Sequence, residues 1–112
     1  MAINRKLLNR EILLGFWKVH ILHHASEGPI IGNWMLEELR EHGYNVSPGT
    51  LYPMLARLCN LGWLETVERK AARVRNRPTH YRLTKAGGDA LAEVQTRLSE
   101  LQREVFAPRR KN

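Results

Sequence analysis

Apolar residues recur at helical spacing along most of the chain. In the stretch that starts near residue 48, intervals of four and three predict a helix with an inward face made of Leu51, Leu55 and Leu58. A second set lies between Gly32 and His42, where the inward face is Met35, Leu36 and Leu39. Only a short link, residues 44–46, separates the two stretches. Helix, brief connection and helix is the arrangement of a helix-turn-helix unit.

The second helix of such a unit enters the major groove of DNA, so its start and its outer face form the candidate reading surface. Ser47 and Thr50 are alternative N-caps, and Pro48 needs no backbone N–H in a first turn. Pro53 favours the later start, because deeper in the helix it would forfeit a bond at about 3 kcal/mol. We therefore expect the regular helix to start at Thr50, after a turn or a kink. Its outer face would carry Thr50, Tyr52, Met54, Arg57 and Asn60.

The first segment, roughly Arg5 to Ala25, predicts a helix that is apolar around most of its circumference. A helix of this kind must be buried on more than one side. We expect one side to pack on the domain core and another to meet a second subunit. The segment would end at a turn over residues 26–29.

After Gly62 the pattern changes to the loose alternation of β-strands, at residues 63–68 and again at 80–84. We predict a two-stranded hairpin, or wing. The segment between the strands is strongly basic, and the predicted phosphate or minor-groove contacts are Arg69, Lys70, Arg73, Arg75 and Arg77. The alternative is an ordinary solvated loop.

The last long segment predicts a helix with Thr84 as its N-cap and with Gly87 and Gly88 in its first turn, where a missing side chain allows close backbone approach. Its apolar residues repeat at intervals of three and four, as in a heptad seam: Leu91, Val94, Leu98, Leu101 and Val105. The alternative is an amphipathic helix packed on its own domain. We favour pairing between subunits.

Length and charge narrow the class of protein. A chain of 112 residues has the size of one domain with its own core. A formal net charge of +7 suggests nucleic acid or an anionic membrane surface as a partner. The basic residues gather in the first ten residues, in the wing and in the tail, which favours a binding face over a uniformly charged surface.

The membrane alternative is weak, because the apolar run from Ile12 to Leu22 is about half of the ~20 residues that a spanning helix needs. The single cysteine, Cys59, cannot form an internal disulfide, and the start of the chain has no secretion signal. We therefore expect a cytoplasmic protein without a membrane partner.

The expected fold class is mainly α with a small β-hairpin wing. We predict a winged helix-turn-helix domain over residues 1–83, with a recognition-helix region at about 48–61 and the wing at about 63–83. A C-terminal dimerisation helix would follow at 84–107 and a basic tail at 108–112.

At this point the sequence resembles the PadR-type transcriptional regulators. The resemblance is carried by S-P-G-T-L-Y-P-M-L-A-R-L at 47–58, L-G-W-L at 61–64 and H-Y-R-L-T-K-A-G at 80–87. It extends from about residue 12 to the end of the final helix, and the chain has the size of the members with one C-terminal helix. One departure is the run at 28–34, where many members have a Gly-Tyr entry to the second helix.

The resemblance implies a homodimeric repressor that places its recognition helices in successive major grooves and its wings over the backbone or minor groove. It also implies that phenolic acids or other aromatic compounds relieve repression in some members. We expect the two protomers to pair through their C-terminal and N-terminal helices.

The candidate DNA contacts of the recognition helix are Ser47, Pro48, Thr50, Tyr52 and Arg57. Arg57 is suited to bidentate bonds with guanine, Thr50 to phosphate or a thymine methyl, and Tyr52 to phosphate. Tyr52 is equally suited to packing beneath the wing. A pocket for an aromatic effector would involve Phe16, Trp17 and Phe106, although core packing is the more ordinary role for each.

Other chemistry finds little support. His20, His23 and His24 share a helix face, but they have no cysteine pair or nearby carboxylate cluster, so we expect no metal site and no cofactor. The sequence has no recognisable catalytic constellation or phosphate-binding loop, so an enzyme is not expected. The rival function is a winged-helix module that binds nucleic acid as an architectural or protein-bridging element without an effector.

Overall fold

The chain folds as helices around a small antiparallel sheet, and the computed structural model describes residues 2–67 and 78–108. An N-terminal helical segment comprises α1 (Arg5–Leu8), a π-helical stretch η1 (Asn9–Leu13) and α2 (Leu14–Glu27). Then come β1 (Ile30–Ile31), α3 (Gly32–Glu41), α4 (Pro48–Asn60), β2 (Leu64–Val67), β3 (His80–Leu83) and α5 (Lys85–Val105). None of the described helices is long and apolar enough to cross a bilayer. The predicted fold class, mainly helical with a small β wing, is confirmed.

The core lies where α2, α3 and α4 meet. The residues of the predicted inward faces of α3 and α4 are buried, and α2 adds Trp17, Ile21, Leu22 and Ala25. Met54 joins this core with 6% of its surface exposed, so its predicted place on the outer face of α4 is wrong. A position three residues after Leu51 and four before Leu58 falls on the same helix face as both.

The sheet has three strands in the order β1-β3-β2, and both pairs are antiparallel. β2 and β3 are the two arms of the predicted wing, with Leu64 opposite Leu83 and Val67 opposite His80. Strand β1, which pairs Ile30 with Tyr81, was not predicted. Its two apolar residues are too few to show a periodicity, and they lie between the predicted turn at 26–29 and the helix predicted from Gly32. That turn also starts later than expected, because α2 continues to Glu27 and the chain turns at Gly28, where φ is 154°.

Helix α4 begins at Pro48 with Ser47 in the extended N-cap conformation, so the predicted start at Thr50 is wrong. The backbone N–H groups of Thr50 and Leu51 both donate to the Ser47 carbonyl oxygen, at 3.0 Å. Pro53 therefore lies inside the helix. Burial of the four apolar residues on the inner face of α4, each worth about 1.5–3 kcal/mol, outweighs the bond that Pro53 cannot make.

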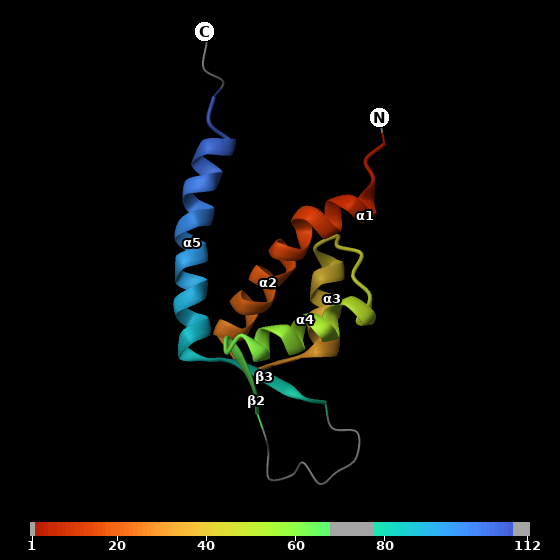
Figure 1. The fold of residues 1–112 in the computed structure, drawn as a ribbon, viewed down its shortest axis with the longest axis vertical. Coiled ribbons are helices and arrows are strands. Elements are labelled where there is room, and N and C mark those ends of the chain that lie inside the picture. Colours follow the sequence, from red (N-terminus) through yellow and green to blue (C-terminus); the bar gives the residue numbers. More distant parts are fainter. Residues whose placement is uncertain (1, 68–77, 109–112) are drawn as a thin grey trace.

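Helix α5 starts as the sequence predicts. The Thr84 hydroxyl oxygen accepts a hydrogen bond from the Gly87 N–H at 2.9 Å, which is an N-cap bond. Gly87 is buried against the wing, and a Cβ there would lie 2.1 Å from the Trp63 carbonyl oxygen. Beyond Leu91 the helix extends away from the core, and it stands apart from α1 at the end of the molecule that holds both termini (Figure 1).

The tight approach at Gly87 predicts that Gly87→Ala lowers the free energy of unfolding by about 1–3 kcal/mol, because the new methyl group meets backbone atoms that cannot rotate away. Gly88→Ala is the matched control, since its Cβ would meet only Leu83 Cδ2, at 3.8 Å. We expect the control to be as stable as the wild type or more stable. Urea unfolding at one protein concentration measures both; equal stability of the two variants would contradict the prediction.

Candidate nucleic-acid interface

The link between α3 and α4 is held by backbone hydrogen bonds at the end of α3 and by a bond from the Arg40 side chain just before α4. The N–H of Gly43 donates to the Arg40 carbonyl oxygen at 2.9 Å, and that of Tyr44 donates to the Leu39 carbonyl oxygen at 3.1 Å. Gly43 has φ of +90°, a left-handed conformation that a residue without Cβ adopts at little cost. Arg40 Nε then donates to the Val46 carbonyl oxygen at 3.1 Å. The path of the link from α3 to α4 is therefore held by two main-chain bonds and by the Arg40 side chain.

The outer face of α4 carries the predicted contact residues in exposed or half-buried positions. Ser47, Pro48 and Arg57 are exposed, and Thr50 is half-buried. The side chain of Ser47 makes no capping bond to the backbone and donates instead to the Thr50 hydroxyl oxygen at 3.2 Å. The first turn of α4 thus presents a helix N-terminus without a side-chain cap, which is a favourable place for a phosphate group.

Tyr52 lies over the start of α3. Its ring is 45% exposed, and a Cβ built on Gly32 would approach Tyr52 Cε1 to 2.5 Å. The ring therefore rests on the Gly32 backbone, and part of it still faces outward. The sequence suggested either packing or a DNA contact for Tyr52. In the structure its side chain packs on α3 and is still partly exposed.

The N-terminal segment brings further basic residues beside the start of α4. Lys6 and Arg10 line a shallow hollow together with Asn45, Ser47 and Thr50. The predicted contact set left these two cations out, although the positive charge of the first ten residues was the signal that pointed to them. The sequence could not show the path of η1, which places Arg10 beside the start of α4.

The wing is described at its base and not at its tip. Arg82 Nε donates to Glu65 Oε1 at 2.6 Å across the strand pair, and both side chains are exposed, so the ion pair contributes at most about 1 kcal/mol. The predicted basic contacts Arg69, Lys70, Arg73, Arg75 and Arg77 lie outside the described residues.

The three aromatic residues considered for an effector pocket lie apart. Trp17 is 2% exposed in the core, where its ring packs edge-on against Tyr44, and Phe106 is 78% exposed at the end of α5. Phe16 lines a cavity of about 330 Å³ between α2 and α5, and neither Trp17 nor Phe106 belongs to that cavity. Its other lining residues are Val19, His20, His23, Leu91, Gln95 and Leu98.

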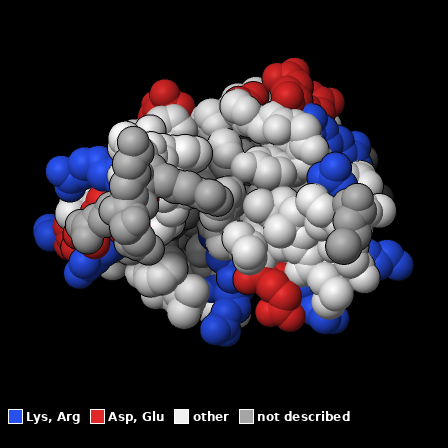
Figure 2. Space-filling view, turned by 90° about the horizontal axis from the view of Figure 1, so that it is seen from above, with Lys and Arg blue, Asp and Glu red and all other residues white. Residues whose placement is uncertain are grey.

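The apolar row on α5 changes from buried to exposed along the helix. Leu91 is buried and Val94 is half-buried, whereas Leu98, Leu101 and Val105 are 40%, 53% and 61% exposed. In the N-terminal helical segment, Ile12 and Phe16 are also exposed, and Phe16 shares a cavity with Leu91 and Leu98. Figure 2 shows the end of the molecule that holds both termini, where residues other than Lys, Arg, Asp and Glu form most of the middle.

A helix pair linked at a fixed angle, followed by an antiparallel β2–β3 wing that packs on it, defines the winged helix-turn-helix class. In helix-turn-helix proteins the second helix of the pair enters the major groove, and α4 is the second helix of the pair in this chain.

Comparisons with known proteins identify the family. Residues 21–93 match the model of the transcriptional regulator PadR-like family. The chain is 46% identical over 101 residues to Transcriptional regulator Rv3488 of Mycobacterium tuberculosis, an alignment that covers 87% of this chain and 89% of the relative. The chain therefore belongs to the PadR-like family of transcriptional regulators, whose members bind DNA and are not enzymes.

Solved structures agree with this assignment. A PadR-like transcription factor from Bacteroides fragilis superposes with a TM-score of 0.69 at 29% identity, over 88% of this chain and 94% of that one. A PadR-like transcriptional regulator from Bacillus cereus gives a TM-score of 0.71 at 22% identity, over 88% and 99%. The second match supports the fold alone.

The position of Arg10 predicts that Arg10→Gln lowers the slope of log affinity against log salt concentration by about 0.9, because one phosphate contact is lost. The matched control is Arg103→Gln, which removes the same charge from the last turn of α5. Fluorescence anisotropy with labelled duplex DNA at several salt concentrations measures the slopes. An equal change in both variants would mean that only net charge matters.

Proposed function

We propose that this PadR-family regulator is a homodimeric, sequence-specific repressor that reads DNA with α4. The observation that carries the proposal is the division of α4 into two faces. Leu51, Leu55 and Leu58 are fully buried, so α4 cannot rotate without opening the core. Arg57 and the uncapped first turn consequently stay on the outside of a rigid element, as a reading helix requires.

Each outer residue of α4 has a role that suits its chemistry. Arg57 reads a guanine through its two parallel N–H donors. The first turn, with Ser47, Pro48 and Thr50, binds a phosphate together with Lys6 and Arg10, and so sets the register of the helix in the groove. Tyr52, whose ring packs on Gly32, donates a hydrogen bond from its hydroxyl to a phosphate. The five basic residues of the wing tip contact the backbone or minor groove beside it.

Two protomers pair through α5 and the N-terminal helices. Support comes from the apolar row at Leu98, Leu101 and Val105, which the core of its own chain leaves exposed, and from the exposed Ile12 and Phe16 of the N-terminal helical segment. Burial of such a row against a second copy removes apolar surface from water at about 25 cal/mol per Å². A two-fold dimer presents two α4 helices, which fit successive major grooves when they are about 34–36 Å apart.

Relief of repression is assigned to the cavity between α2 and α5. Its volume of about 330 Å³ suits a small aromatic compound, and its lining is mostly apolar with His20, His23 and Gln95 as polar groups. Because Leu98 belongs both to this cavity and to the apolar row, a bound ligand acts on the angle between the two protomers.

The function is tested by a gel shift with DNA from upstream of the chain's own coding region, repeated with phenolic acids. A repressor gives one tight, sequence-selective complex of a dimer, and a fitting effector releases it. Indiscriminate binding that no ligand changes would overturn the proposal in favour of an architectural or protein-bridging module.

For base reading by Arg57, we expect Arg57→Ala to cost about 1–3 kcal/mol of affinity for the operator and to relax specificity at one base pair. Affinity for random DNA should change far less. A binding selection on randomised operators, run with wild type and variant, measures both effects. An equal loss on operator and random DNA would make Arg57 a phosphate contact.

For the dimer, Leu101→Glu should raise the dimer dissociation constant by about tenfold or more, equal to about 1.4 kcal/mol, because a carboxylate would be buried in the seam. Ser99→Glu adds the same charge to another face of α5 and should leave the dimer intact. Sedimentation equilibrium measures both variants. A dimer that tolerates Leu101→Glu would exclude this seam as the interface.

A further inference from the structure

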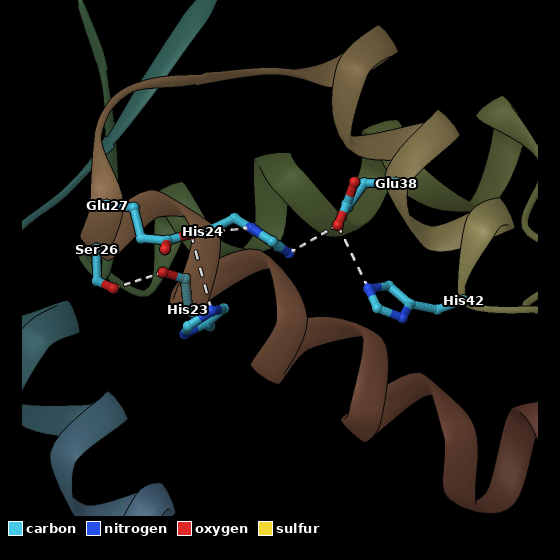
Figure 3. Close-up of polar contacts among 6 residues, drawn as sticks. All are labelled: His23, His24, Ser26, Glu27, Glu38 and His42. Carbon is cyan, nitrogen blue, oxygen red and sulfur yellow. Dashed lines mark hydrogen bonds and ion pairs between the residues drawn. The ribbon is translucent and has the colours of Figure 1, made fainter.

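Three histidines and a glutamate converge where α2 meets the C-terminal end of α3. His20 and His24 are one helical turn apart on α2, and Glu38 and His42 are one turn apart at the end of α3. Residues four apart share a helix face, so each element directs two ligand-type side chains toward the other. In Figure 3, the Glu38 carboxylate lies between the rings of His24 and His42.

The distances are close to those of a metal centre. One ring nitrogen each from His20, His24 and His42 lie within 4.8 Å of one another. Glu38 Oε1 is 3.4 Å from His24 Nε2 and 3.3 Å from His42 Nε2. Two ligands bound at ~2.1 Å to a tetrahedral ion lie about 3.4 Å apart, so these two pairs already have the spacing of ligands around one ion. The ring nitrogens of the three histidines, which are up to 4.8 Å apart, must move closer to one another by at most about 1.4 Å to reach this spacing. Rotation of the side chains is enough for such a movement.

We propose that His20, His24, His42 and Glu38 form a binding site for a divalent transition-metal ion such as Zn²⁺. Imidazole nitrogens with one carboxylate are a ligand set that suits zinc and its neighbours in the first transition row. The site joins two consecutive helices, α2 and α3, which are separated in the chain by the short strand β1.

The surroundings of His24 support the proposal. Its Nδ1 lies 3.2 Å from Glu27 Oε1, on the side of the ring away from Glu38. When Nε2 binds a metal, Nδ1 carries the hydrogen and donates a hydrogen bond to this carboxylate. Metal-ligating histidines are usually oriented by such a partner.

A second group, His23, His24 and Glu27, competes for the same role. It comes from one helix, His23 and Glu27 are exposed, and the contact between them is long, at 3.8 Å. The group around Glu38 draws on two elements and is more buried at His20 and Glu38. In our assignment Glu27 is the outer partner of His24, and His23 takes no part.

The test uses the full chain without a polyhistidine tag. Titration with Co²⁺ should give one ion per chain with the intense visible absorption of tetrahedral cobalt, and Zn²⁺ should displace it. We expect His42→Gln and Glu38→Gln each to weaken Zn²⁺ binding by more than about tenfold, and His23→Gln to leave it unchanged. Because 48% of the His42 side chain is exposed, its replacement does not disturb the core.

Thermal unfolding separates metal binding from folding. Saturating Zn²⁺ should raise the unfolding temperature of the wild type and of His23→Gln, and should not raise that of His42→Gln, while the metal-free proteins unfold alike. Wild-type protein that binds neither Co²⁺ nor Zn²⁺ at micromolar concentration would overturn the proposal. The four side chains would then have only a packing role. Loss of binding in His23→Gln with retention in His42→Gln would also overturn it and place the ion on α2 alone.

Discussion

The close contact between the Gly87 backbone and the Trp63 carbonyl is the constraint on which the arrangement of α4, wing and α5 depends. At this junction the Trp63 N–H donates to the Leu58 carbonyl oxygen, and the Trp63 carbonyl oxygen accepts from the Thr84 N–H. The Thr84 hydroxyl then bonds to both Gly62 and Gly87. The end of the reading helix, the base of the wing and the start of α5 are thereby joined within a few residues. A change in the direction of α5 must act on α4 through these bonds.

The same junction separates two kinds of surface. On one side, α4 and the N-terminal segment present hydroxyl, aromatic and cationic groups around a helix N-terminus. On the other, α5 exposes an apolar row that its own domain does not cover. The groups that suit a polyanion and those that suit a second copy of the chain are therefore held apart. A single rigid domain can then engage both partners at once.

The sequence predicted the elements that repeat a pattern over several turns. Leu51, Leu55 and Leu58 predicted α4, and the cap at Thr84 predicted the start of α5, because each depends on residues close together in the chain. The start of α4 was wrong because local bonding rules weighed the cost of Pro53 without the burial that offsets it. Strand β1 was missed because its two residues are stabilised by pairing with β3, some fifty positions away. Such pairing leaves no local signal.

The candidate site divides in the same way. Residues on α4 could be named from the sequence, whereas Lys6 and Arg10 enter only through the path of the N-terminal segment. For the histidines, the sequence showed His20, His23 and His24 on one face and no nearby carboxylate cluster. Glu38 and His42 reach them because α3 folds back against α2, a contact that helix periodicity cannot predict.

Pro53 has one more effect on the reading helix. It has no N–H to offer to the Gly49 carbonyl, four residues earlier, so that oxygen lacks its usual helical partner. Both residues are exposed. The first turn of α4 thus carries a main-chain acceptor that can receive a hydrogen bond from water or from the amino group of a base. Substitution of the neighbouring side chains leaves this acceptor in place.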